Sequence, residues 1–152
     1  MRADAIIKPH KLQNMLAENR RLQSVERYLN IINEFSSRIS TLHSLEDIVW
    51  TIARHPIAEL DFEDCIVYLL DKSRNVLVQK AAFGPKNPVG YQIKDPIEIP
   101  IGEGIVGSVA QSREPEIVTD TRKDPRYIVD DEVRLSEISV PILFGEIGRA
   151  HV

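Results

Sequence analysis

The chain has 152 residues, of which 43% are hydrophobic and 28% are charged, as in an ordinary globular protein of one domain. A net charge of -4 excludes the basic surface typical of nucleic-acid-binding proteins, so we expect no nucleic-acid partner. The sequence has neither an apolar run long enough to span a membrane nor a signal peptide, and this favours a cytoplasmic location.

The first predicted element is a long helix within residues 1–42. No glycine or proline occurs between Lys11 and Leu42, whereas Pro9 is expected to break a helix. Two arrangements fit its apolar stripe: a parallel coiled coil with a second chain, giving a homodimer, or packing on the domain's own sheet. The stripe, hereafter the seam, recurs in alternating steps of three and four and consists of Leu22, Val25, Leu29, Ile32 and Ile39, with Ser36 interrupting.

A second helix is predicted to begin after Ser44, which occupies the place of an N-cap ahead of acidic residues in the first turn. The dipeptide His55-Pro56 predicts its end, because the residue before a proline disfavours helical backbone angles. Trp50 has helical spacing, and we interpret it as a core residue. The apolar positions that share one face of this helix are Leu45, Ile48, Val49 and Ile52.

The rest of the sequence predicts a mainly antiparallel sheet. Apolar and β-branched runs separated by turn residues indicate hairpins, and one helix is expected over Gly104–Ser112. Hairpins with interspersed helices are typical of an α+β fold. The predicted strands are Cys65–Asp71, Val76–Phe83, a short edge-like strand around Ile97–Ile101, Glu116–Thr119 and Ile138–Phe144.

Residues 102–107 spell G-x-G-x-x-G, the pattern of a dinucleotide-binding loop, and Asp120 lies near the spacing of its ribose-binding acid. Other features weigh against that interpretation. The preceding run contains Pro100 and alternates, whereas a central parallel strand is continuously apolar, and Glu103 would place a negative charge beside the pyrophosphate. A dinucleotide-binding oxidoreductase therefore remains a weak alternative.

The segment from Ile97 to Ile142 resembles GAF domains in the order and spacing of several motifs. The resemblance implies an antiparallel sheet flanked by helices, with a pocket on one face, preceded by a long signalling helix. It also implies a sensor protein of a two-component system, with a histidine kinase as the expected parent. The motifs are IPIGEGIVG at 99–107, REP at 113–115, IVTD at 117–120, DPRY at 124–127 and SVPI at 139–142.

This resemblance divides the chain into a signalling and coiled-coil helix at 1–42, a GAF domain at 43–145 and a tail at 146–152. The family's closing strands and helix are expected after Phe144, and the remaining residues do not supply them, so we predict a truncated domain. The tail reads as the in-frame translation of a DNA-sequencing adapter and is left out of the fold prediction.

A ligand site is predicted where the helix at Gly104 begins. Free backbone N–H groups at a helix start suit polar or anionic groups, and the following loop presents an arginine and a tyrosine. Each residue also has a structural interpretation: the glycines shape the backbone, and Asp120 caps a turn. The ligand and any cofactor are not identified. The predicted ligand-binding residues are Gly104, Ile105, Ser108, Asp120, Arg126 and Tyr127.

No catalytic or metal-binding residue is predicted. One GAF branch reduces free methionine sulfoxide with several cysteines, whereas this chain has only Cys65, interpreted as a small buried residue on a strand. The paired acids Asp130-Asp131 are interpreted as solvated. We therefore expect a non-enzymatic module for small-molecule sensing and dimerisation that relays ligand state through its helix to an output domain beyond this chain. The alternative is a ligand-free GAF domain that serves only as a dimerisation spacer.

Overall fold

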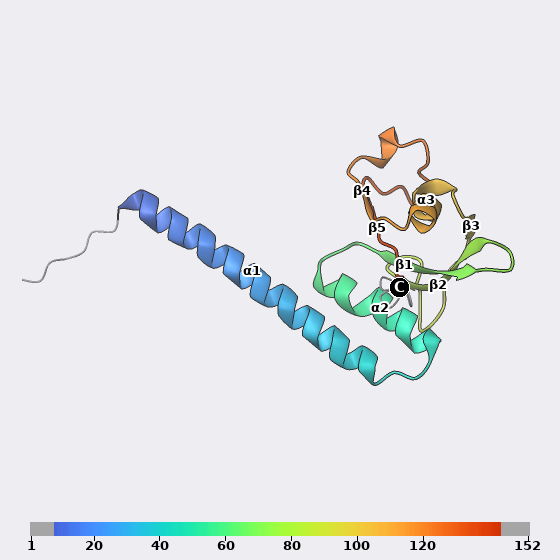
Figure 1. Ribbon diagram of the computed structural model, residues 1–152, viewed down its shortest axis with the longest axis horizontal. Coiled ribbons are helices and arrows are strands. Elements are labelled where there is room, and N and C mark those ends of the chain that lie inside the picture. Colours follow the sequence, from blue (N-terminus) through green and yellow to red (C-terminus); the bar gives the residue numbers. More distant parts are fainter. Residues whose placement is uncertain (1–7, 144–152) are drawn as a thin grey trace, which may run out of the picture.

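The computed structural model describes residues 8–143, in which a long helix leads into an α+β domain (Figure 1). The predicted tail at 146–152, and Phe144 before it, lie outside the described residues. The helices are α1 (Pro9–Ser40), α2 (Leu45–Glu59), α3 (Gly104–Ser112) and the 3-10 helix η1 (Thr121–Lys123). The strands are β1 (Cys65–Asp71), β2 (Val76–Phe83), β3 (Glu98–Pro100), β4 (Glu116–Val118) and β5 (Glu137–Ser139).

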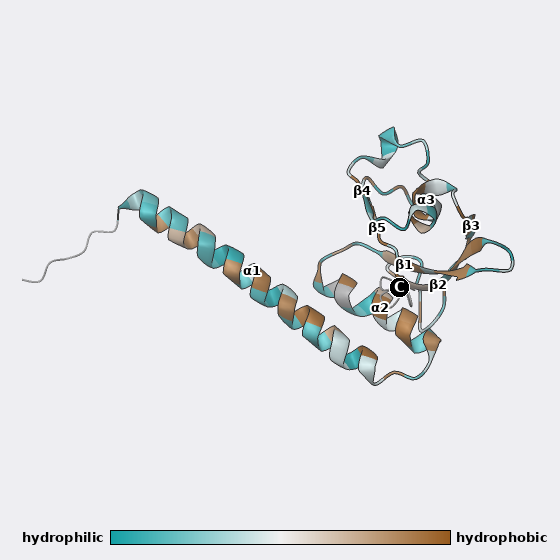
Figure 2. Cartoon of the chain, in the orientation of Figure 1, coloured by the Kyte–Doolittle hydropathy of each residue, from teal (hydrophilic) through white to brown (hydrophobic). Residues whose placement is uncertain are grey.

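Helix α1 begins at Pro9, earlier than Lys11, and Lys8 before it is not helical, so Pro9 opens the helix and does not interrupt one. Proline is tolerated in the first helical turn, because its missing N–H would have no partner within the helix there. Figure 2 shows apolar segments along α1 that alternate with polar ones. The helix ends at Ser40, where the Thr41 N–H donates to the Arg38 carbonyl at 3.2 Å.

The seam of α1 points away from the domain. Leu22, Val25, Leu29 and Ile32 are 47–59% exposed, and Ile39 is half-buried. A neighbouring face of α1 carries the half-buried Ile31 and Phe35, which line a narrow space with residues of α2. The seam therefore does not pack on the domain's own sheet, and pairing with a second chain remains the other arrangement.

Helix α2 continues past Pro56 to Glu59, so its predicted end was too early. Packing of α2 on β1 and β2 outweighs the local preference of a proline, because tertiary context commonly overrides propensity. The predicted start is confirmed. Ser44 Oγ accepts from the Asp47 N–H at 3.0 Å and donates to the Asp47 carboxylate at 2.6 Å, which forms a reciprocal cap.

The strands form two antiparallel ladders rather than one sheet. The larger has the order β1-β2-β3, with Cys65 opposite Phe83 and an irregularity between Val67 and Tyr68, and the smaller pairs β4 with β5. Strand β5 ends at Ser139, earlier than predicted, since Pro141 cannot donate a ladder hydrogen bond.

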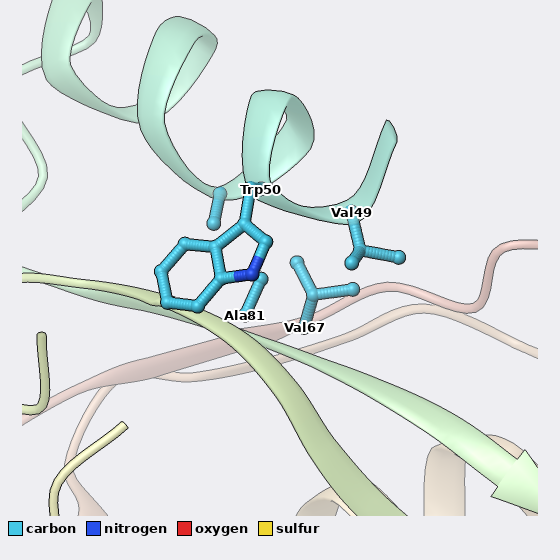
Figure 3. Packing of buried hydrophobic residues seen from close by; sticks show 5 residues of the cluster. Val49, Trp50, Val67 and Ala81 are labelled. Carbon is cyan, nitrogen blue, oxygen red and sulfur yellow. The ribbon is translucent and has the colours of Figure 1, made fainter. Parts of the chain in front are cut away.

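The main core lies between α2 and the larger sheet (Figure 3). Val49, Trp50 and Ala53 of α2 pack against Val67 of β1 and Ala81 of β2. Trp50 is 2% exposed, which confirms it as a core residue, and its ring stacks on Tyr91 with centroids 4.9 Å apart. Figure 1 shows α3, β4 and β5 on the opposite side of the larger sheet from α2. The candidate ligand site therefore lies on the sheet side remote from α2.

Candidate functional site

The glycine-rich turn before α3 has the backbone role that the sequence suggested. Gly102 and Gly104 adopt φ angles of +87° and +66°, which residues with a side chain rarely adopt. A Cβ on Gly107 would lie 2.6 Å from the Pro100 carbonyl oxygen, so only glycine permits this close approach. Because β3 pairs antiparallel with β2, the dinucleotide interpretation, which needs a parallel strand there, is wrong.

The start of α3 lies against the loop that follows η1. A Cβ on Gly104 would lie 2.6 Å from Cδ1 of Ile128 and 3.6 Å from the Arg126 carbonyl oxygen. Two predicted site residues, Gly104 and Arg126, are therefore neighbours in space. Ile105 is 2% exposed and its side chain belongs to the core, while the Ser108 hydroxyl donates to the Gly104 carbonyl at 2.6 Å.

Asp120 caps the turn that follows β4. Its carboxylate accepts from the backbone N–H of Arg122 at 3.2 Å and from the Arg122 guanidinium at 2.8 Å. These hydrogen bonds, with a further one from Lys123, hold the pKa of Asp120 below its usual value. The structural interpretation of Asp120 is thus realised.

Arg126 and Tyr127 both have partners within the chain. The Arg126 guanidinium donates to both oxygens of Asp124, at 3.0 and 2.7 Å, and to both oxygens of Glu116. Hydrogen bonds to Asp124 and then to Glu116 raise the pKa of Arg126. The Tyr127 hydroxyl accepts from the Arg134 N–H at 2.7 Å. A ligand at either residue would have to displace or share these partners, and its binding there stays a prediction.

A buried polar cluster beneath this loop was missed by the sequence analysis. Lys86, 3% exposed, donates to the Asp130 carboxylate at 2.8 Å and to the Asp95 carbonyl at 2.7 Å. Gln79 of β2 donates to the other Asp130 oxygen at 2.6 Å and to the Tyr68 hydroxyl at 3.1 Å. Asp130 is therefore not solvated, contrary to expectation. The one signal in the sequence was Gln79, a polar residue within an apolar strand.

Carboxylates gather at the edge of the site near β4 and β5. Burial, followed by the nearby charges of Asp124, Asp64 and Glu116, raises the pKa of Glu137. Asp64 accepts from the Arg134 guanidinium at 2.8 Å, and this arginine also lies 3.2 Å from Asp131. Because this edge already carries several carboxylates, hydrogen-bond donors of a ligand suit it better than an anionic group does.

Cys65 lies on β1, half-buried, and packs against the core between α2 and the sheet. Burial, with a smaller contribution from Asp64, raises the pKa of its thiol to about 11. The thiolate is the nucleophilic form, so this environment disfavours reactivity.

Away from this site, an open groove of about 380 Å³ runs between α1 and α2. Within residues 8–143, no three histidine, cysteine or acidic side chains converge as a metal site. No helix in this part of the chain combines the length and apolar character that crossing a membrane requires. The groove is lined by Gln23, Glu26, Arg27, Asn30, Ile31, Glu34 and Glu59.

Comparison with known proteins gives a consistent family. The model of the GAF domain family matches residues 43–151. Curated proteins give no significant match.

Several solved structures share the fold and are matched over 57–70% of their own length. The GAF domain of an Acinetobacter phosphoenolpyruvate-protein phosphotransferase is 23% identical, with a TM-score of 0.67 over 77% of this chain and 69% of that one. A protein from Burkholderia vietnamiensis assigned as a GAF sensor is 24% identical, with a TM-score of 0.62 over 77% and 68%. The methionine sulfoxide reductase fRMsr of Staphylococcus aureus, in complex with its substrate, is 27% identical, with a TM-score of 0.59 over 76% and 70%.

Proposed function

Since the chain belongs to the GAF domain family, we propose that it is a non-enzymatic sensory module, homodimeric through α1, that relays the binding of a small molecule to an output domain. A histidine kinase of a two-component system is the parent protein we favour. The observation that carries the proposal is the place of α2. This helix contacts α1 on one side and both β1 and β2 on the other, so it joins the sheet to the signalling helix.

A continuous set of contacts leads from the loop to α1. Asp130 in the loop accepts from Gln79 of β2 at 2.6 Å. Two residues further along β2, Ala81 packs against the buried face of α2. On its other side, α2 contacts α1, and the guanidinium of Arg38 in α1 lies 2.6 Å from Nε2 of His55 in α2. A ligand that binds one arrangement of the loop more tightly than another can shift α1 by this route.

The chemistry of the site favours a modestly polar metabolite over a nucleotide. Backbone N–H groups at the start of α3 suit hydrogen-bond acceptors. The carboxylates of Glu116, Asp124 and Glu137 repel strongly anionic groups, and Glu103 stands beside the helix start. A suitable ligand therefore carries acceptor groups for the N–H groups of α3 and donor groups for the carboxylates.

The test is a thermal-shift screen of the 152-residue chain against small polar metabolites, followed by calorimetric titration. We expect at least one compound to raise the melting temperature and to bind with a measurable Kd. The same compound should change hydrogen exchange in α1 near Arg38. A spacer without a ligand would show no shift with any compound, and binding without a change in α1 would refute the relay.

The likeness to the Staphylococcus aureus reductase supports one alternative, reduction of free methionine sulfoxide. The single cysteine and its raised pKa count against it. Incubation of the chain with free methionine-R-sulfoxide and dithiothreitol distinguishes the two functions. Our proposal predicts no methionine above the level given by Cys65→Ser, whereas methionine formed only by the chain with Cys65 would establish a reductase.

A further inference from the structure

The seam of α1 has the geometry of a two-stranded coiled coil. Its residues alternate in steps of three and four, which puts Leu22 and Leu29 at the first apolar position of each heptad and Val25 and Ile32 at the second. These four side chains are 47–59% exposed. Since α2 covers a different face of α1, the seam is open to a partner helix.

The charged residues beside the seam distinguish between the two directions of pairing. In a parallel pair, the residue one place before a first heptad position lies opposite the partner residue whose number is five higher. Arg21 and Glu26 have this relation and opposite charges. A parallel, in-register pair therefore brings Arg21 of each chain to Glu26 of the other, twice by symmetry.

An antiparallel pair lacks this match. It places residues that precede the seam opposite each other, so Arg21 meets Tyr28 or another Arg21, and Glu26 meets Asn33 or another Glu26. In the single chain, Arg21 lies 3.9 Å from Glu18, and these side chains are 77% and 60% exposed. This loose contact leaves the Arg21 guanidinium accessible to a second chain.

We propose that two copies of this chain pair through α1 in parallel and in register, and that Arg21 of one copy pairs with Glu26 of the other to fix that direction. The inference rests on the homodimer in the proposed function and adds the contact between Arg21 and Glu26 that fixes its direction and register. The apolar seam supplies the attraction, and the charges select one arrangement among those that bury the same surface.

Charge reversal in the full chain tests the pairing by sedimentation equilibrium at low salt. We expect Arg21→Glu and Glu26→Arg each to raise the dimer Kd about tenfold, because two attractive contacts become repulsive. The double variant should return to within about twofold of the original Kd, and an equimolar mixture of the two single variants should form heterodimers. A double variant as weak as the single ones refutes the Arg21–Glu26 contact and leaves the homodimer standing.

Cysteine cross-linking in a Cys65→Ser background tests direction independently. In a parallel pair, Leu22→Cys and Ile32→Cys each oxidise to a disulfide-linked dimer, because like residues face each other. In an antiparallel pair, two cysteines at position 22 lie about 15 Å apart, and only a mixture of the two variants cross-links. Cross-linking that occurs only in the mixture would overturn the proposed parallel direction and leave the proposed homodimer standing. A chain that stays monomeric at every concentration refutes both the inference and the proposed homodimer.

Discussion

The Nζ atom of Lys86 lies 2.8 Å from Oδ1 of Asp130, and only 3% of the lysine side chain is exposed. The two residues come from different loops, and the second oxygen of Asp130 accepts from Gln79 of β2. Asp130 thus ties the loop over the candidate site both to the sheet and to the segment that follows β2. Since little of either side chain contacts water, each charge depends on the other to offset its loss of hydration.

We predict that Lys86→Ala lowers the free energy of unfolding by roughly 3–5 kcal/mol, because it leaves the carboxylate of Asp130, which is only 13% exposed, without its cation. Urea denaturation measures the change. Arg74→Ala is the control, since Arg74 lies 2.8 Å from Glu98 but both side chains are about half exposed. Its effect should be much smaller, because water screens an exposed pair. Equal losses for the two variants would show that burial does not govern the Lys86 pair.

Gly107→Ala should destabilise the protein although alanine is the better helix former. The exchange gains about 1 kcal/mol of helix propensity in α3. The new Cβ, however, would lie 2.6 Å from the backbone carbonyl of Pro100, and such overpacking costs about 1–3 kcal/mol. We therefore expect a lower midpoint in urea. A stabilised Gly107→Ala variant would mean that the β3–α3 connection yields easily, and Ala110→Gly in the same helix measures propensity without the clash.

Local patterns were sufficient to predict several elements. The bounds of β1, β2 and α3 agree with the sequence prediction, because a polar turn, alternating apolar residues and positive-φ glycines act within a few positions. The contact between the start of α3 and the loop at Arg126 was also anticipated.

Features that depend on distant residues were not predictable. Lys86 and Asp130 are 44 positions apart, so neither residue alone indicates a buried pair. The continuation of α2 through Pro56 depends on the sheet beneath it, and local preference gave the opposite answer. The ion pair of Arg126 with Glu116, ten positions away on β4, likewise appears only when the loop folds back on that strand.

Stability is predicted to fall as the pH rises above about 9. Burial raises the pKa of Cys65 from 9.0 to about 11 and that of Tyr68 from 10.0 to about 12. Both groups are neutral when protonated and hold their protons more tightly in the folded state. The stability they contribute is complete below the unfolded pKa and is lost as the pH rises towards the folded pKa.

Urea midpoints between pH 8 and pH 12 measure this fall, and Cys65→Ser should remove the part that begins near pH 9. At pH 8 the folded chain should also react with Ellman's reagent roughly 100-fold more slowly than it does in urea, because a pKa two units higher leaves that much less thiolate. Equal rates in both conditions would show an accessible, ordinary thiol.

The homodimer is predicted to depend on the seam. Leu29→Asp with Ile32→Asp should leave the chain monomeric in sedimentation velocity, because unpaired carboxylates cannot be buried between two helices. Leu16→Asp is the matched control: Leu16 is also on α1 and 52% exposed, but lies off the seam, so the dimer should persist. A dimer that survives the double substitution would place the interface elsewhere.

Arg126 is predicted to contribute to ligand binding rather than to stability. Arg126 lies beside the start of α3, since a Cβ on Gly104 would lie 3.6 Å from the Arg126 carbonyl oxygen. Its planar guanidinium has several N–H groups that can donate to polar acceptors on a ligand. Because the side chains of Arg126 and Glu116 are 38% and 35% exposed, water screens this ion pair, and Arg126→Ala should change the melting temperature by less than about 2 °C. With the ligand found by the thermal-shift screen, calorimetry should show a Kd at least about tenfold higher. Arg74→Ala serves as the control, since Arg74 lies in the turn between β1 and β2, pairs with Asp71 at 2.8 Å and is 53% exposed. That variant should bind as the unaltered chain does. Unfolding of Arg126→Ala would make Arg126 structural, and unchanged affinity together with unchanged melting would place the ligand away from this loop.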